Sequence, residues 1–163
     1  GRIGQETAKI ALGIGMNVLF TDKFVGKTQI DLNLAYDKKI SFDLESSDMT
    51  DLLKNSDFVS LHVPAQKSYV IGKNEFNLMK TGAGLINAAR GGVIDEKSLL
   101  ESLDNGKLAF AGIDTFENEP KPSVKLLMHP KVSLTPHIGA ATNEAQDRIG
   151  IELAIQIMTL VKQ

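Results

Sequence analysis

The sequence predicts an α/β fold built on a doubly wound parallel sheet, and two observations support this prediction. Short, almost continuously apolar segments alternate with segments of helical periodicity along the 163 residues. Strands that are apolar on both sides are typical of parallel sheets with helices on both faces. The composition, with 42% hydrophobic and 23% charged residues, is that of a globular chain that can bury a sizeable core.

The N-terminal part begins with a glycine turn at residues 1–4, which leads into a helix that Gly13 or Gly15 is expected to end. A short apolar strand is predicted over residues 17–22. Residues 23–37 are ambiguous, because an alternation of apolar side chains suits a strand while the surrounding residues suit a helix equally well.

Beyond this segment, strands and helices alternate. Strands are expected at residues 39–42, 58–62, 84–88, 109–114 and 132–134, and helices at residues 47–54, 73–79 and 95–103. Asp95 and Glu96 stand at the start of one of these helices, where carboxylates cap the first turn and interact favourably with the helix dipole. Residues 141–163 are predicted to form one long amphipathic helix capped by Thr142 or Asn143.

Charge and composition argue against several classes of function. The formal net charge is −2, with 18 basic and 20 acidic residues intermixed, so we expect neither a nucleic-acid partner nor a membrane partner. The sequence contains no cysteine, which rules out thiolate zinc sites and thiol nucleophiles and weakly favours a cytoplasmic location. The three histidines lack the spacing of metal ligands, so no metal site is expected.

The N-terminal segment has the order of a dinucleotide-binding fingerprint. A Gly-x-x-Gly turn at residues 1–4 opens a helix, and the strand that follows ends in an acid, Asp22. In such Rossmann-type units the helix amides face a pyrophosphate and the acid binds a ribose hydroxyl. The glycines alone fit a helix that packs closely on a sheet at least as well as they fit a dinucleotide site. Asp22 at the end of the next strand makes the two interpretations equally well supported. In the fingerprint interpretation, the first strand and first glycine lie upstream of residue 1.

Three ionisable residues, Arg90, Glu119 and His137, follow the last three predicted strands. Because parallel strands end on the same edge of a sheet, we expect the three side chains to gather there. The alternative for Arg90 is an ion pair with a carboxylate at the sheet edge. Gly91 and Gly92 are expected to leave room for a cofactor or substrate beside this arginine.

The chemistry of this trio suits the interconversion of a 2-hydroxy acid and a 2-oxo acid. The guanidinium of Arg90 can bind a carboxylate through paired hydrogen bonds and polarise a carbonyl oxygen. His137 can exchange a proton near neutral pH, while Glu119 would set its basicity and orientation. None of the three can accept a hydride, so a nicotinamide cofactor would have to carry it.

Several ordered segments resemble the nucleotide-binding domain of the D-isomer-specific 2-hydroxyacid dehydrogenases. Besides the glycine turn and Asp22, they are LHVP at 61–64, INAARG at 86–91, AGIDTF at 111–116, EP at 119–120 and TPHIG at 135–139. The resemblance covers nearly the whole chain and implies the catalytic set Arg90, Glu119 and His137, with NAD as cofactor. Residues 136–146 are most similar to members that oxidise 3-phosphoglycerate to phosphohydroxypyruvate at the start of serine biosynthesis.

The resemblance also implies a set of cofactor contacts. These are Gly1, Arg2, Ile3 and Gly4 at the pyrophosphate, Asp22 at the adenine ribose, Val63 and Pro64 on the adenine side, and Ala88, Asp114, Gly139 and Ala140 around the nicotinamide, with Arg90 and His137 also in contact. An acid at position 22 favours NAD over NADP, because it would repel a 2′-phosphate. His62 is expected at a strand edge near the cofactor and outside the chemistry.

Members of this family also carry a substrate domain, built largely from residues that precede the glycine turn. We therefore expect a longer polypeptide in which residues 1–140 are an NAD-binding domain without its first strand. Residues 141–163 would then pack on the absent substrate domain or on a second subunit, in a homodimer or a higher homo-oligomer. Two alternatives to a dehydrogenase stay open: an NAD(H)-sensing, corepressor-like binding module, and a fragment without function on its own.

Overall fold

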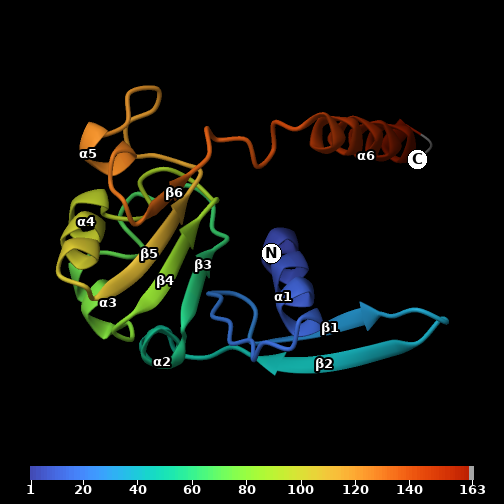
Figure 1. Cartoon of the computed structure of the whole chain (residues 1–163). Coiled ribbons are helices and arrows are strands. Elements are labelled where there is room, and N and C mark those ends of the chain that lie inside the picture. Colours follow the sequence, from blue (N-terminus) through green and yellow to red (C-terminus); the bar gives the residue numbers. More distant parts are fainter. Residues whose placement is uncertain (162–163) are drawn as a thin grey trace.

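The computed structural model describes residues 1–161 as an α/β molecule (Figure 1). Its strands are β1 (Lys27–Asn33), β2 (Lys39–Glu45), β3 (Phe58–Leu61), β4 (Ala83–Asn87), β5 (Leu108–Ile113) and β6 (Val132–Leu134). Its helices are α1 (Arg2–Gly13), α2 (Met49–Asn55), α3 (Lys73–Leu78), α4 (Glu96–Asp104), α5 (Val124–Leu127) and α6 (Asn143–Val161). Strands β3 to β6 form a parallel sheet in that order, and β1 and β2 form a separate antiparallel pair.

The core lies between one face of the parallel sheet and helices α2, α3 and α4, which contact one another in sequence. Successive strand residues point to opposite faces. On the helix side, Val59, Leu85 and Ala111 are buried in register across β3, β4 and β5. Leu99 of α4 is fully buried in the same core.

On the opposite face of the sheet, two aromatic rings from β3 and β5 lie on either side of a glycine of β4. Phe58 and Phe110 flank Gly84 in register, and their ring centroids lie 6.0 Å apart. A Cβ on Gly84 would lie 2.4 Å from the Phe110 ring, so the glycine is what lets the rings approach. Phe58 remains 51% exposed, and the helices therefore cover this face less completely than the predicted arrangement requires.

The predicted strand over residues 17–22 is wrong. A strand needs a hydrogen-bonded neighbour along its length, and residues 17–19 have none within the described chain. The pairing that this segment does make is an isolated parallel bridge between Phe20 and Ser46. The ambiguous segment 23–37 contains β1, which pairs antiparallel with β2 in a hairpin. The predicted strand at 39–42 is confirmed as part of β2, but it lies outside the parallel sheet.

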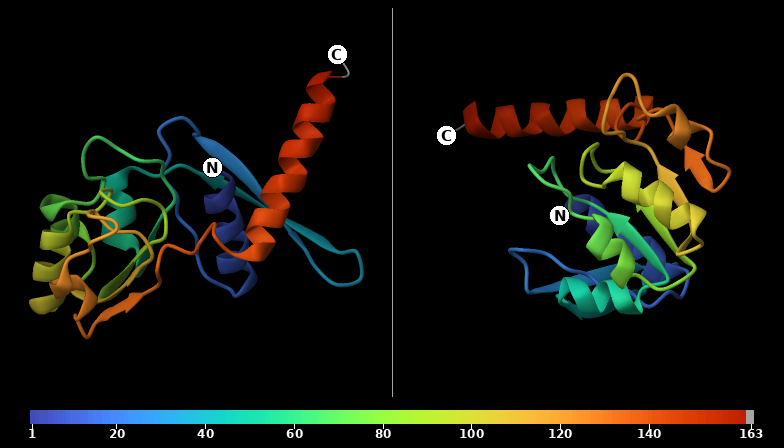
Figure 2. Two further views of the ribbon diagram at one scale, coloured as in Figure 1. Left: turned by 90° about the horizontal axis from the view of Figure 1, so that it is seen from above. Right: turned by 90° about the vertical axis from the view of Figure 1, so that its left-hand side faces the viewer.

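Helix α6 projects from the rest of the molecule (Figures 1 and 2). Thr142 caps it as predicted, its hydroxyl accepting a hydrogen bond from the Ala145 amide at 3.2 Å. The helix has no buried residue, and Glu152 accepts two hydrogen bonds from the Arg2 guanidinium. Packing of its apolar side chains on a further domain or subunit stays a prediction. In the part of the chain that the structure describes, no helix is both long and apolar enough to cross a membrane.

Candidate active site

The structure brings Glu119 and His137 together beyond the ends of β5 and β6. The Nδ1 atom of His137 lies 2.8 Å from Oε2 of Glu119. Arg90 lies beyond the end of β4, where its Nη1 atom donates a hydrogen bond to the Ala89 carbonyl at 2.6 Å. Among the described residues, Arg90 forms no hydrogen bond with Glu119 or His137 and no ion pair with any carboxylate.

The Glu119 carboxylate fixes how His137 is oriented. Its Oε1 atom accepts a hydrogen bond from the Phe116 amide at 2.9 Å. This amide, followed by the His137 ring, lowers the pKa of Glu119 below its ordinary value, so the carboxylate is ionised at neutral pH. An ionised carboxylate only accepts hydrogen bonds, so Nδ1 of His137 carries the proton of this bond. The Nε2 atom is therefore the one that can exchange a proton with a substrate.

His137 has a φ of 54°, a left-handed conformation that is unfavourable for a residue with a side chain. The buried Asp114 carboxylate holds the loop in this conformation from the end of β5. Its Oδ1 accepts from the Thr135 hydroxyl at 2.5 Å and the Ile138 amide at 2.9 Å, while Oδ2 accepts from the Gly139 amide at 3.1 Å. Burial would raise the pKa of Asp114, but these hydrogen bonds outweigh it and lower the pKa.

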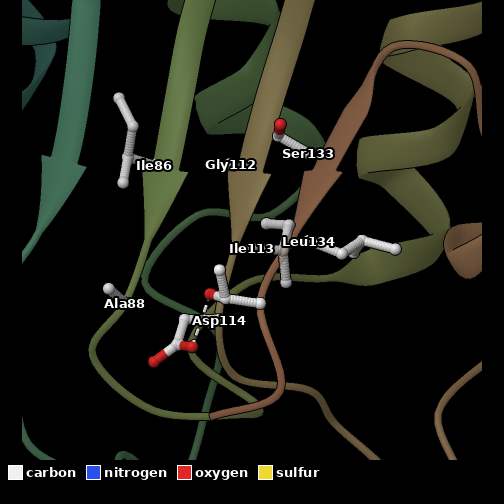
Figure 3. Close-up of a pocket in the computed structure, with 8 residues that line it drawn as sticks. Ile86, Ala88, Gly112, Ile113, Asp114, Ser133 and Leu134 are labelled. Carbon is white, nitrogen blue, oxygen red and sulfur yellow. Dashed lines mark hydrogen bonds between the residues drawn. The ribbon is translucent and has the colours of Figure 1, made fainter. Parts of the chain in front are cut away.

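A small, mainly apolar hollow lies against the parallel sheet beside Asp114. Its lining comes from the ends of three neighbouring strands: Ile86 and Ala88 of the β4 end, Gly112, Ile113 and Asp114 of the β5 end, and Ser133, Leu134 and Thr135 of the β6 end. Figure 3 shows Ala88 and Asp114 at the strand ends. The Asp114 carboxylate accepts a hydrogen bond from the Thr135 hydroxyl. The hollow offers an apolar surface next to a polar anchor, which suits a flat ring that carries an amide.

The start of α1 fits a pyrophosphate and a ribose. The first amides of a helix have no partner within it, and Gly1 provides no side chain to cap them. Asp22 stands beside this end, with its Oδ2 atom 3.8 Å from the Gly1 nitrogen. Its Oδ1 atom accepts from the amides of Phe24 and Val25, which lowers the pKa of Asp22 and keeps it ionised. Free amides beside a carboxylate are what the two halves of a dinucleotide need.

The end of β3 joins these two regions. A Cβ on Gly4 would lie 3.5 Å from that of His62, so the start of α1 approaches this histidine. His62 makes its 3.0 Å hydrogen bond with Ser60, and burial lowers its pKa. Val63 is half-buried against the core and Pro64 is exposed. Within residues 1–161, no group of three or more histidine and acidic side chains could hold a metal ion.

Sequence reasoning gave Glu96 only a capping or helix-dipole role and did not single out Glu117. Each accepts a hydrogen bond from the backbone amide of the other. The predicted cap is confirmed for Asp95, which accepts from the amides of Lys97 and Ser98. Glu96 lies in the first turn of α4, and its side chain accepts from the Glu117 amide instead of capping the helix. The sequence did contain a signal: Asp95 alone can cap the helix, so a second carboxylate at position 96 is free for another contact.

The expectation that Gly91 leaves room for a cofactor or substrate is wrong. A Cβ on Gly91 would lie 1.8 Å from the carbonyl oxygen of Phe116, in the loop after β5. The glycine is therefore required for the close approach of two loops. Gly92 has a φ of 74°, which favours glycine for its backbone conformation.

The sequence model of one protein family, the D-isomer specific 2-hydroxyacid dehydrogenase, NAD binding domain, matches residues 1–139. The chain belongs to this family. It carries the family's NAD-binding domain, in which β3 to β6 form a four-stranded parallel sheet, and NAD is the cofactor of this domain. The residues at the start of α1, at Asp22 and around the hollow fit that cofactor.

Among relatives in this dehydrogenase family, a hydroxypyruvate reductase of Thermotoga maritima is 44% identical, over 96% of this chain and 49% of its own length. A D-3-phosphoglycerate dehydrogenase of Archaeoglobus fulgidus is 39% identical, over 99% of this chain and 30% of its own length. The solved structure of a D-2-hydroxyisocaproate dehydrogenase matches with a TM-score of 0.78 and 32% identity, covering 99% of this chain and 51% of that protein. The chain thus spans about half or less of these relatives.

Proposed function

We propose that the natural protein carrying this chain is an NAD-dependent dehydrogenase of small D-2-hydroxy acids. The observation that carries this proposal is the 2.8 Å hydrogen bond between Glu119 and His137 at the edge where Arg90 also lies. We favour 3-phosphoglycerate and phosphohydroxypyruvate as the substrate pair. The similarity to D-3-phosphoglycerate dehydrogenases supports this choice, while the similarity to a hydroxypyruvate reductase keeps the unphosphorylated acid in the test.

In the reduction, the Arg90 guanidinium binds the carboxylate of the 2-oxo acid and polarises its carbonyl. His137 donates its Nε2 proton to the carbonyl oxygen as the carbonyl carbon receives a hydride, which yields the D-2-hydroxy acid and a neutral imidazole. Glu119 holds the ring and balances its positive charge before the transfer. Reduced NAD supplies the hydride when bound, because no side chain here can provide one.

The test measures NADH oxidation by the natural protein with glyoxylate, pyruvate, hydroxypyruvate and phosphohydroxypyruvate. His137→Ala should lower kcat about 10²- to 10⁴-fold, the usual contribution of a general acid. Arg90→Ala should raise KM for the 2-oxo acid and lower kcat, because the substrate loses its anchor. His129→Ala is the matched control, since His129 pairs with Asp104 near the start of β6.

Turnover that survives both substitutions would overturn the catalytic roles. Failure of the wild type to reduce any of the four acids would overturn the substrate class and favour the cofactor-sensing alternative.

A further inference from the structure

Two carboxylates outside the catalytic set connect the loops that carry it. Glu96, at the start of α4, accepts a hydrogen bond from the Glu117 amide at 2.7 Å. Glu117, in the loop after β5, accepts one from the Glu96 amide at 2.9 Å. Arg90 lies in the segment between β4 and α4, which ends at Glu96, and Glu119 lies in the same loop as Glu117. This reciprocal pair therefore joins two parts of the candidate site.

One half of the pair completes the cap of α4, because Glu117 accepts from the amide of Glu96, the first residue of the helix. Asp95 caps α4 by accepting from the amides of Lys97 and Ser98. Glu96 is 8% exposed, and burial together with the nearby Glu117 carboxylate raises its pKa. Burying one carboxylate beside another is unfavourable unless the hydrogen bonds that it accepts compensate for the lost hydration.

The contacts continue from this pair to the proton-exchanging group. Phe116 precedes Glu117, and its carbonyl oxygen packs against Gly91 closely enough to exclude a side chain there. The Phe116 amide donates to Glu119, which in turn holds His137. A displacement of the Glu117 backbone would therefore move the residue that orients the imidazole.

A third loop meets the same pair. Tyr69, in the loop that follows β3, lies beside the Glu117 carboxylate, whose negative charge raises the pKa of the phenol. The amides of Val70 and Ile71 both donate to the Val93 carbonyl, between Arg90 and Glu96. The loop after β3 thus bonds to the segment between Arg90 and Glu96, next to the pair.

We propose that Glu96 and Glu117 are positioning residues that hold the Arg90 turn and the Glu119 loop in the relative placement that the reaction requires. This inference rests on the proposed function, because its consequence for rate presupposes that Arg90, Glu119 and His137 act on one substrate. The interaction itself is a property of the protein without substrate, and it can be measured separately.

The first experiment follows hydrogen exchange in the natural protein without substrate. Glu96→Ala should speed exchange of the Glu117 amide at least tenfold, because its acceptor is lost, and Glu117→Ala should do the same for the Glu96 amide. Glu96→Gln and Glu117→Gln keep an acceptor oxygen and should stay within about threefold of the wild type. Glu101→Ala, which removes an exposed carboxylate from the same helix, is the matched control.

The second experiment measures steady-state kinetics of the same variants. Each alanine variant should lower kcat at least tenfold with little change in KM for NADH, and each glutamine variant should restore most of kcat. A general loss of stability would lower the folded fraction, and hence the apparent kcat, without changing KM, so kcat is calculated per folded molecule of each variant. Thermal melting of each variant confirms that it is folded.

Wild-type exchange and wild-type kcat in both alanine variants would overturn the inference, and so would glutamine variants as slow as the alanine variants. If an alanine variant does not fold, Glu96→Asp and Glu117→Asp replace it. These keep the charge but shorten the reach, so they should be slower than the glutamine variants, and the reverse order would contradict the inference. If the wild type reduces no 2-oxo acid, the proposed function fails while hydrogen exchange still decides whether the pair holds the loops.

Discussion

At the scale of single residues, the candidate site depends on carboxylates that hold backbone in place. Asp114 uses both oxygens on the loop that carries His137, which lets this residue keep its unfavourable φ of 54°. Glu119 uses one oxygen on the Phe116 amide and the other on His137. The orientation of the imidazole therefore rests on two carboxylates that the chain supplies from the region after β5.

Asp114→Asn should lower the stability of the folded state at neutral pH. The pKa of Asp114 is below its ordinary value of 3.8. A lowered pKa adds stability that is present above the unfolded value and is lost as pH falls through the lower folded value. Urea unfolding of wild type and variant should therefore show a difference at pH 7 that narrows below pH 3.8.

Asp43→Asn, at an exposed position on β2, is the control for this comparison and should change the midpoint little at either pH. A difference that stays constant down to pH 3 or below would contradict the role of the Asp114 charge.

At the scale of elements, the loops after β4 and β5 pack on each other as closely as backbone allows. Position 91 accepts no side chain because the Phe116 carbonyl occupies that space. The sequence predicted that glycine was needed there, but it assigned the space to a ligand. The group that occupies this space belongs to a loop 25 residues further along the chain, so it cannot be identified from the local sequence around Gly91.

Gly91→Ala should destabilise the natural protein by about 1–3 kcal/mol, the usual cost of forcing extra atoms into a packed site. Since the displaced loop carries Glu119, kcat should fall as well. Chemical denaturation and NADH oxidation measure the two effects. Gly26→Ala is the control, because a Cβ there meets nothing within 4 Å. Equal stability and activity of Gly91→Ala and the wild type would show that the two loops can separate freely.

The hairpin shows where reasoning from periodicity fails. The apolar alternation around Ile30 indicated a strand but not its partner, and the same pattern occurs in parallel and antiparallel sheets. Tyr36 and Asp37 both adopt left-handed φ values in the turn, although neither is a glycine. Without a glycine signal in the sequence, this turn could not be predicted.

At the scale of the whole molecule, the site stands on one hydrophobic core. Helices α2, α3 and α4 bury one face of the parallel sheet, and the strand ends on this platform present Arg90, Asp114 and His137 along one edge. The two aromatic rings on the other face stay partly exposed, as does the apolar surface of α6. A rigid core below the loops is what allows their hydrogen bonds to define a geometry.

Leu99→Ala should reduce the free energy of unfolding by about 2–5 kcal/mol, because a fully buried side chain leaves a cavity between α4 and the sheet. Chemical denaturation of the natural protein measures the change. Leu34→Ala, at a half-exposed site beside the hairpin turn, should cost much less. Comparable losses at the two positions would contradict the placement of the core.

The sequence by itself determined the α/β class, most of the elements of the parallel sheet, the family and its NAD cofactor. These follow from periodicities and motifs contained in short windows of residues. Only the tertiary structure decided that residues 17–22 form no regular strand, that Gly91 makes room for Phe116, and that Glu96 pairs with Glu117. The reason is physical: each of these depends on which distant segment lies within hydrogen-bonding or van der Waals distance, and on how deeply the contact is buried.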